Sequence, residues 1–323
     1  MINITAGTQL DHFRIDRMVA TSKTTALYQA TDLNTGAPVA IKVPHVNMVA
    51  DAVFAERFHR EEEIGTELSH PGVMKVIPNP HRTVMYMVLE WIDGRLLRDV
   101  ISSEAPLAQE RAVHIALGIL EALDYIHSHG IVHRDLRPEH VILLVDDRVK
   151  LVDFGLAGQM GAKRVTFTNI AELISDGNYL APEQIAGKRG DARSDLYAVG
   201  VMLYEMLSGV LPHGEVTSLD RFNDRMLHDP APIRKVNAAV SRELEEILRR
   251  VLEREPLHRY ANARELAHDL AHPESVLITS PAPTRKEAAR RSATAASRTL
   301  ILFGLLLVPA VLFLLIYLFS QQR

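Results

Sequence analysis

The 323-residue chain contains no cysteine, which excludes disulfide bonds and cysteine-ligated metal sites. Its 36 basic and 40 acidic residues give a formal net charge of only −4, so nothing indicates nucleic-acid binding. The first residues, MINITAGTQLDHF, lack a basic region followed by an apolar run, so no signal peptide is predicted. With 47% hydrophobic residues, the chain is long enough to form the cores of two lobes or domains.

One long apolar run is present near the end of the sequence. Residues 299–319 contain no charged residue, and as a helix they would span roughly 31 Å, close to the thickness of a bilayer core. A buried core helix is the alternative, although the apolar character continues all around the helix. The basic residues before the run are Arg285, Lys286, Arg290, Arg291 and Arg298, and only Arg323 follows it. The positive-inside rule therefore predicts a single-pass membrane helix with residues 1–298 in the cytoplasm.

The rest of the sequence changes from a β pattern to an α pattern. Alternating runs between residues 9 and 45 predict strands, with Asn34-Thr35-Gly36 at a hairpin tip. Residues 51–68 have the apolar spacing of a helix, and residues 83–92 predict another strand. Further helices are predicted at 107–128, 194–208, 241–253 and 262–271, with short strands around 141–152. This order predicts an α+β fold in two lobes, followed at 273–298 by a basic juxtamembrane linker that is solvated or rests on anionic lipid.

Four chemical signals follow one another in a fixed order. They are VAIK ending at Lys42, RFHREEE containing Glu61, HRDLRPEH containing Asp135, and VDFG containing Asp153; YLAPEQ and SDLYAVGVMLYEMLSG come after them. In this order and spacing the sequence resembles the eukaryotic-like protein kinases, and looks most like the membrane-anchored bacterial Ser/Thr kinases. The resemblance covers residues 10–272. It implies a protein-kinase fold with a small β-rich lobe at about 10–92 and a large α-rich lobe at about 93–272.

The resemblance also implies a role for each charged residue. Phosphoryl transfer needs positioning and charge neutralisation more than covalent chemistry. Lys42 would bind the α and β phosphates of ATP, and Glu61 would pair with it; Glu62 is a second choice because three glutamates are adjacent. Asp153 would hold the Mg²⁺ that bridges the phosphates, and Asp135 would accept or orient the hydroxyl of a protein substrate.

Further matches to the family concern the nucleotide pocket and the support of the loop. Leu89 matches the gatekeeper, and backbone groups of Glu90 and Ile92 would meet the adenine, with Val19 and Ala40 also expected at the nucleotide. Residues with structural roles are expected at His133, Arg134, Glu183, Asp195 and Arg259, among which Glu183 and Arg259 form an ion pair.

The loop that covers the phosphates departs from the family pattern. The three glycine positions fall on Ala20, Ser22 and Thr25. Glycine permits positive φ and a close approach of the backbone to phosphate, whereas a left-handed non-glycine residue costs about 1–2 kcal/mol. The loop is therefore expected to take another path or to cover ATP less closely. Hydroxyls of Ser22, Thr24 and Thr25, with Lys23, would replace some contacts, or the turn has no phosphate role at all.

The catalytic loop departs from the pattern HRDLKPEN at two positions, Arg137 and His140. The family's asparagine supplies an oxygen to a second metal ion, and Mg²⁺ prefers oxygen, whereas imidazole suits softer ions. His140 is therefore expected either to weaken that site or favour Mn²⁺, or to hydrogen-bond within the loop. Arg137 is expected in the catalytic machinery, and the family's threonine falls on Asp176, so an ion pair between Arg137 and Asp176 is a hypothesis.

Two functions of different classes remain open. Lys42, Glu61, Asp135 and Asp153 favour an active Ser/Thr kinase, of full or reduced activity, using ATP with Mg²⁺ or Mn²⁺ on an unknown protein substrate. The missing glycines and asparagine favour a pseudokinase that binds a nucleotide or a partner; a small-molecule phosphotransferase is a remote third class. Phosphorylation at Thr166, Thr168 or Ser175 could dock on Arg134, and dimerisation follows from family resemblance alone.

Overall fold

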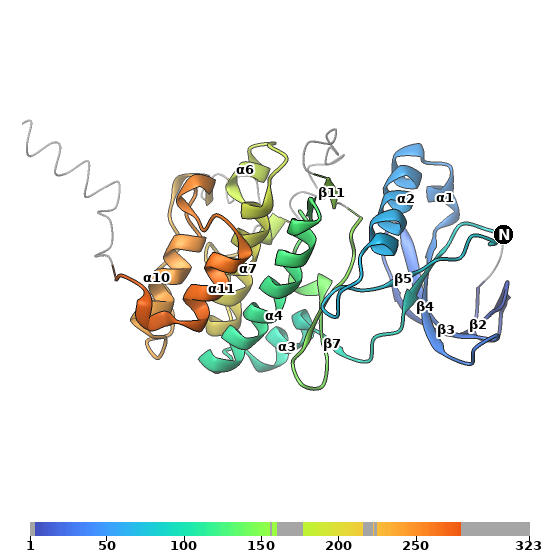
Figure 1. Cartoon of the computed structure of the whole chain (residues 1–323), viewed down its shortest axis with the longest axis horizontal. Helices are drawn as coiled ribbons and strands as arrows, with labels where there is room; N and C mark the ends of the chain where they lie inside the picture. Colours follow the sequence, from blue (N-terminus) through green and yellow to red (C-terminus); the bar gives the residue numbers. More distant parts are fainter. Residues whose placement is uncertain (1–3, 156, 160–176, 216–221, 223–224, 279–323) are drawn as a thin grey trace, which may run out of the picture. The chain divides into compact units, whose positions relative to one another are not determined.

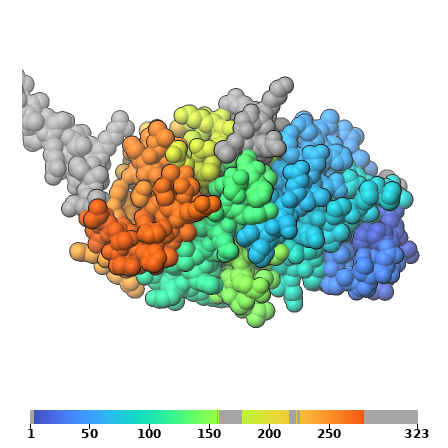
Figure 2. Space-filling model, in the orientation of Figure 1, coloured from blue at the N-terminus to red at the C-terminus, as the bar shows by residue number. Residues whose placement is uncertain are grey.

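The computed structural model describes residues 4–155, 157–159, 177–215, 222 and 225–278. Strands dominate before residue 96 and helices dominate after it, so the predicted α+β architecture in two lobes is confirmed (Figure 1). Figure 2 shows the same residues as a surface, with the small lobe in blue to cyan and the large lobe in green to orange.

The small lobe is built on an antiparallel sheet whose described strands have the order β1-β2-β3-β4-β6-β5. Its strands are β1 (Gln9–Leu10), β2 (Phe13–Thr21), β3 (Thr25–Asp32), β4 (Pro38–Pro44), β5 (Val76–Ile77) and β6 (Met87–Glu90). The β3–β4 hairpin turns at the predicted tip, where Gly36 has a φ of 76°. The strand predicted at 83–92 is shorter, because the Thr83 N–H donates to the Asp11 carboxylate and not to a neighbouring strand.

The helix predicted at 51–68 is α2 (Ala52–Glu67), which follows the short α1 (Val46–Val49). Asp51 caps α2 by accepting hydrogen bonds from the N–H groups of Val53 and Phe54. Gly65 lets α2 approach β5 closely, since a Cβ there would lie 2.2 Å from Cγ2 of Val76. One turn earlier on the same face, Glu61 is only 3% exposed, so this close packing turns a carboxylate into the interior.

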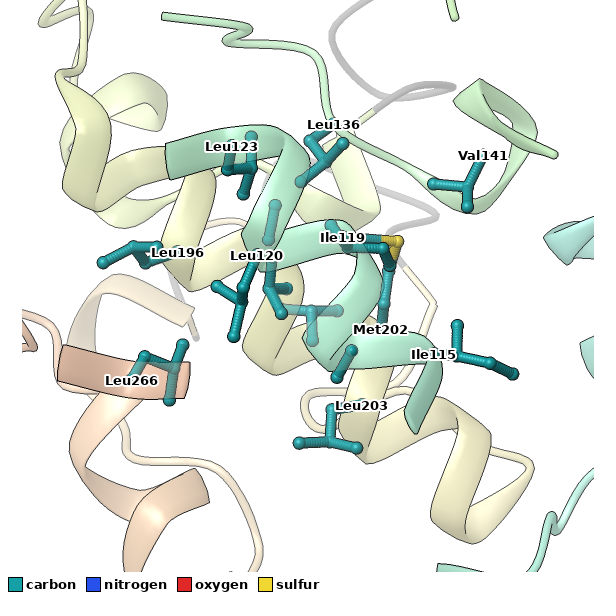
Figure 3. Close-up of a cluster of buried hydrophobic side chains, with 14 of the residues drawn as sticks. Ile115, Ile119, Leu120, Leu123, Leu136, Val141, Leu196, Met202, Leu203 and Leu266 are labelled. Atoms are coloured by element: carbon teal, nitrogen blue, oxygen red, sulfur yellow. The ribbon is translucent and has the colours of Figure 1, made fainter. Parts of the chain in front are cut away.

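The large lobe is arranged around two helices that the sequence predicts. Its described helices are α3 (Leu97–Glu104), α4 (Gln109–Ser128), α6 (Pro182–Ile185), α7 (Ala192–Ser208), α9 (Ile233–Val236), α10 (Arg242–Val251) and α11 (Ala263–Ala271). Leucine, isoleucine and methionine side chains of α4, α7 and α11 interlock in one core (Figure 3). Every residue of α7 from Ser194 to Leu207 is buried, so this helix forms a rigid base for the loops that cross it.

Short strands follow the small lobe, and the last residue of one of them is hydrogen-bonded to that lobe. They are β7 (Arg95–Leu96), β8 (Ile131–Val132), β9 (Val141–Leu143), β10 (Val149–Leu151) and β11 (Gly158–Gln159). The N–H of Met74 donates to the carbonyl of Leu151 at 2.9 Å, and the N–H of Leu151 donates to the carbonyl of Gly72 at 2.8 Å. These bonds fix the end of β10, and with it the residues that follow, against the small lobe.

Several predictions concern residues outside the described ranges. The predicted span at 299–319, most of the linker at 273–298, Asp176 and the loop hydroxyls of Thr166, Thr168 and Ser175 all lie there. Within the described ranges, no helix combines the length and the apolar character needed to cross a membrane.

Candidate active site

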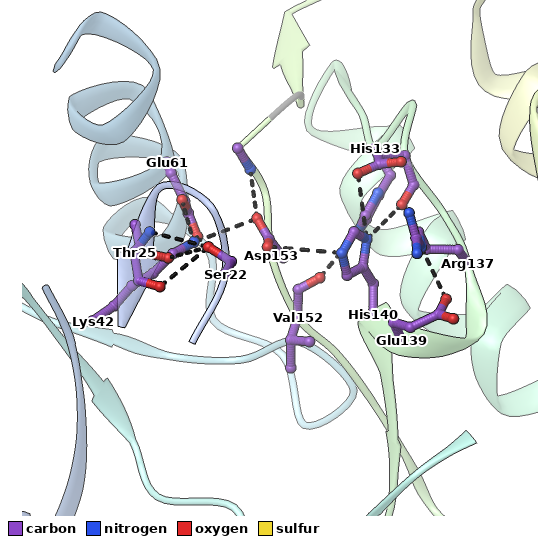
Figure 4. A network of polar contacts seen from close by, with 12 residues as sticks. Ser22, Thr25, Lys42, Glu61, His133, Arg137, Glu139, His140, Val152 and Asp153 are labelled. Carbon is purple, nitrogen blue, oxygen red and sulfur yellow. Dashed lines mark hydrogen bonds and ion pairs between the residues drawn. The ribbon is translucent and has the colours of Figure 1, made fainter. Parts of the chain in front are cut away.

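Lys42 on β4 is the positive centre of the site. Its Nζ lies 2.8 Å from each carboxylate oxygen of Glu61 on α2 and 3.5 Å from Oδ1 of Asp153 (Figure 4). Burial acts to lower the pKa of Lys42, but the charges of Asp153 and Glu61 outweigh it and raise that pKa above its usual value. Lys42 is therefore a fixed cation held by a strand and a helix, as a phosphate-binding group must be.

Asp153 follows β10 with a left-handed φ of 64°. Its Oδ1 accepts a hydrogen bond from the N–H of Gly155 at 3.2 Å. Desolvation acts to raise the pKa of Asp153, but the positive charge of Lys42 and this hydrogen bond hold the pKa well below its usual range. The carboxylate is therefore ionised, and its second oxygen faces the catalytic loop.

His140 lies between the two aspartates of the site, with Asp153 on one side (Figure 4) and Asp135 on the other. Its Nδ1 donates to the backbone carbonyl of Asp135 at 2.6 Å, and its Nε2 lies 3.7 Å from Oδ2 of Asp153. A carbonyl only accepts, so Nδ1 carries the proton of this hydrogen bond and Nε2 is the ring nitrogen directed at Asp153. The sequence presents a hydrogen bond within the loop and metal binding as alternative roles for His140. In this geometry they are compatible, because Nδ1 makes the hydrogen bond and Nε2 stays directed at Asp153.

The catalytic loop is held from below by Asp195 on α7. Its carboxylate accepts the N–H groups of His133 at 2.9 Å and Arg134 at 2.8 Å, and lies 2.8 Å from Nε2 of His127. Burial lowers the pKa of His133 to about 4, so this ring is neutral where it packs against Phe154. Arg134 has a φ of 66°, which the two hydrogen bonds of the loop to Asp195 maintain.

Arg137 is anchored within the loop by Glu139, with Nε 2.8 Å from Oε2. Arg98 on α3 bridges two carboxylates. Its Nε lies 2.9 Å from Glu139 and its Nη1 lies 2.9 Å from Glu205 on α7, and its guanidinium also contacts the Tyr179 hydroxyl. Desolvation acts to raise the pKa of Glu139, but Arg137 and then Arg98 outweigh it and lower it to about 2. No sequence pattern points to Arg98, because its partners are far away along the chain.

The expected nucleotide residues are only partly brought together. Ala40 and Leu89 are buried in one cluster of the small lobe, against which Ile92 and Val152 pack. Glu90 uses its carboxylate to bind Lys150 and the N–H of Lys75, which fixes the connection between the lobes. Val19 lies outside this cluster and is 40% exposed, at a bulge of β2 between Met18 and Ala20.

The loop aligned with the glycine loop contains no left-handed residue. Within the described residues, positive φ values of non-glycine residues occur only at Asp11, Arg134, Asp147 and Asp153, so Ala20, Ser22 and Thr25 are free of left-handed strain. Ser22 instead closes a tight turn with Thr25 (Figure 4). The suggested replacement of phosphate contacts by the Ser22 hydroxyl is weakened, since this oxygen is occupied within the turn.

Comparison with known proteins gives the family directly. The family "Protein kinase domain" matches residues 15–271. This chain belongs to the protein kinase family. The kinase domain is 32% identical over 265 residues to the serine/threonine-protein kinase PknB of Mycolicibacterium smegmatis, covering 80% of this chain and 42% of that protein. It is also 34% identical over 249 residues to a probable serine/threonine-protein kinase of Streptomyces coelicolor, SCO3848, covering 76% and 37%.

Solved structures agree with this assignment. The kinase domain of PknI from Mycobacterium tuberculosis superimposes with a TM-score of 0.65 at 26% identity, covering 84% of this chain and 99% of that one. The present chain spans about two fifths of the length of the curated relatives described above. The predicted recognition as a bacterial kinase of the eukaryotic-like type is confirmed.

Two further ion pairs complete the support of the kinase domain. Glu183 and Arg259 form the expected buried pair, with distances of 2.8 and 2.7 Å between their atoms. Glu62, the second choice as partner of Lys42, instead pairs with Arg82, whose Nη2 lies 2.8 Å from Oε2 of Glu62. Adjacent glutamates on a helix point in different directions, so one serves the site and the other serves the outer surface of α2.

Proposed function

We propose that this chain transfers the γ-phosphoryl group of ATP to serine or threonine hydroxyls of a protein substrate. The observation that carries the proposal is one continuous line of contacts. The side chains of Glu61, Lys42, Asp153, His140 and Asp135 follow one another with no step longer than 3.7 Å. Charged groups of both lobes, which lie up to 111 positions apart in the sequence, therefore converge around Lys42 and Asp153. Phosphoryl transfer requires such a convergence.

Each side chain has a role in this mechanism. Lys42 neutralises phosphate charge, and Glu61 keeps the lysine in place. Asp135, whose side chain is 22% exposed, accepts the proton of the attacking hydroxyl or orients that hydroxyl. Arg137, two positions after Asp135 and held by Glu139, would add a positive charge to the catalytic loop.

A divalent cation fits beside Asp153. The described residues contain no cluster of three or more acidic or histidine ligands that would hold a metal alone. The Asp153 carboxylate and the Nε2 lone pair of His140 would therefore hold Mg²⁺ or Mn²⁺ together with phosphate oxygens and water, and the ion would supply charge neutralisation. Imidazole favours Mn²⁺ relative to an oxygen ligand.

The catalytic test uses the purified full chain with radiolabelled ATP and Mg²⁺ or Mn²⁺. Autophosphorylation is expected, and it is expected to disappear in Asp135→Asn and Lys42→Ala while the exposed controls Asp146→Asn and Lys235→Ala keep it. Transfer that persists in both active-site variants would disprove the proposed chemistry.

The metal argument has its own test. His140→Asn is expected to lower the ratio of Mn²⁺-supported to Mg²⁺-supported activity, because an amide oxygen replaces a nitrogen ligand. An unchanged ratio would show that His140 acts only through its hydrogen bond to Asp135.

A nucleotide-binding pseudokinase is the second candidate. One observation favours it: N–H groups of the turn at Ser22, which would otherwise face a phosphate, are bonded within the turn. Thermal stabilisation by ATP without any phosphate transfer would support this function over catalysis.

We also propose that residues 10–272 form the kinase domain and that a basic linker at 273–298 leads to a membrane helix at 299–319. The charge-free run and the arginines before it support an anchored domain in the cytoplasm. Recovery of the chain in the membrane fraction after alkaline extraction, and its release when residues 299–319 are deleted, is the expected result. Equal solubility of both forms would contradict the anchor.

A further inference from the structure

The turn between β2 and β3 is closed by a single hydroxyl (Figure 4). Oγ of Ser22 accepts hydrogen bonds from the N–H groups of Thr24 at 3.2 Å and Thr25 at 3.0 Å. The N–H of Ser22 donates to the carbonyl of Thr25 at 2.8 Å. The backbone donors of Ser22, Thr24 and Thr25 are thus satisfied inside the turn before any ligand arrives.

His45 fastens this turn to the strand that carries Lys42. Its backbone N–H donates to the carbonyl of Thr24 at 2.8 Å, and its Nε2 lies 2.9 Å from the carbonyl oxygen of Ser22. Because a carbonyl only accepts, this ring nitrogen is the donor. The carbonyls of Ser22 and Thr24 are therefore bonded as well. Both bonds come from His45, the residue after β4, so the turn is fastened to the end of that strand.

The chemical consequence concerns phosphate. When a loop binds a phosphate, a phosphate oxygen accepts hydrogen bonds from backbone N–H groups. Here the serine oxygen accepts two such hydrogen bonds in its place. In this turn the acceptor is part of the chain. A phosphate must then compete with Ser22 Oγ for the same donors, or be bound by other groups.

We propose that Ser22 is a positioning residue that reduces the contribution of this loop to phosphate binding, so that the discrimination of ATP from adenosine depends on Lys42 and the groups at Asp153. The inference rests on the proposed nucleotide binding and adds to it which groups select the phosphates. Ser22, in the turn that His45 anchors, sets how much this loop adds to that selectivity.

The test compares affinities of the purified full chain for adenosine and for ATP with Mg²⁺ by calorimetry. Ser22→Ala releases two N–H groups and is expected to raise the ratio of ATP to adenosine affinity about five- to ten-fold, since each regained bond to a charged oxygen is a strong one. Ser22→Gly is expected to act in the same direction, whereas Ser22→Thr retains a hydroxyl and is expected to match the parent chain. In kinetics, KM for ATP is expected to fall with kcat unchanged.

Thr35 provides a matched control at the opposite end of β3. Its hydroxyl also caps a turn, accepting the N–H of Ala37 at 3.2 Å, and Thr35→Ala is expected to leave both affinities unchanged. An affinity ratio within two-fold of the parent in both Ser22→Ala and Ser22→Gly would overturn this inference alone. Failure of the parent chain and all variants to bind either ligand would overturn the proposed nucleotide binding together with it.

Discussion

At the scale of single residues, each charged group of the site keeps its charge because an oppositely charged neighbour is held beside it. Lys42 is cationic because Asp153 and Glu61 flank it, and Asp153 is anionic for the same reason. His140 presents one nitrogen to the loop and the other to Asp153. The chemistry of each group therefore depends on distances of 2.6 to 3.7 Å to its neighbours, of which Asp153 and Lys42 are far apart in the sequence.

Lys42→Met tests this dependence directly. The substitution keeps the length of the side chain but removes the cation, and it is expected to lower kcat/KM for phosphoryl transfer by about 10²- to 10³-fold, as for other single groups that stabilise transition-state charge. Lys235→Met, on an exposed surface, is the matched control. Steady-state kinetics with a protein substrate measure the effect, and retention of more than a tenth of the activity would contradict the role of Lys42.

At the scale of elements, α2 is held on two sides. Glu61 binds Lys42 on the inner side, and Glu62 binds Arg82, which also donates to the carbonyl of Tyr86 at 2.8 Å. The second pair connects α2 to the segment before β6. The position of the catalytic glutamate therefore depends on an arginine outside the site.

Arg82→Ala is expected to lower kcat about ten-fold with a smaller change in KM, because α2 then samples positions in which Glu61 does not reach Lys42. Amide hydrogen exchange in α2 is expected to accelerate. Arg82→Lys should recover part of the rate, since it restores a charge but not the two-pronged contact. The exposed Arg148→Ala is the control, and unchanged exchange in α2 would exclude the proposed coupling.

The pair of Glu183 with Arg259 makes a second prediction at this scale. The Arg259 side chain is fully buried and the Glu183 side chain is 8% exposed. Arg259→Ala is expected to lower the free energy of unfolding by about 3–5 kcal/mol, because a buried carboxylate is left without its partner. Urea denaturation measures the change. Arg264→Ala, which breaks an exposed pair with Asp124, is expected to cost about 1 kcal/mol or less.

A comparison of Arg259→Ala with Arg264→Ala shows whether burial makes the Glu183–Arg259 pair more costly to break. Equal losses would mean that burial contributes nothing to the Glu183–Arg259 pair. The double substitution Glu183→Gln with Arg259→Met is expected to recover part of the stability, because it removes both charges together.

At the scale of the whole molecule, the pH dependence of stability follows from groups buried in the large lobe. Burial lowers the pKa of His133 to about 4, whereas an unfolded histidine has a pKa of about 6.5. Between these values the unfolded chain binds a proton that the folded chain does not, so stability falls as pH falls from about 6.5 to 4. For His133 alone the loss is on the order of 3 kcal/mol.

Glu139 extends this loss to lower pH. Its pKa is about 2 in the folded protein, so the stability that it contributes is present above the unfolded value of about 4.3 and disappears as pH falls towards 2.

Urea denaturation tests the contribution of His133. The urea midpoint is expected to fall between pH 7 and 4, with a smaller slope against pH in His133→Phe. An identical slope in that variant would show that His133 does not carry the effect.

The sequence predicted the lobes, the main helices and the groups of the site because these depend on local patterns. Helical spacing marks α2 and α4, and the tetrads around Lys42 and Asp153 carry their chemistry within a few residues. The contacts of Arg98, Arg82 and His45 could not be predicted in this way. Each joins residues whose separation in the chain carries no periodic signal, so only packing brings them together.

The sequence by itself determined the fold class, the family and the set of residue types at the site, since hydrophobic periodicity and short motifs are written in neighbouring residues. Only the tertiary structure decided how those residues are used. It decided that Glu61 and not Glu62 meets Lys42, that His140 links Asp135 to Asp153, and that Ser22 occupies the donors of its own loop. The physical reason is that hydrogen bonds and ion pairs act over about 3 Å in space, whatever the distance along the chain.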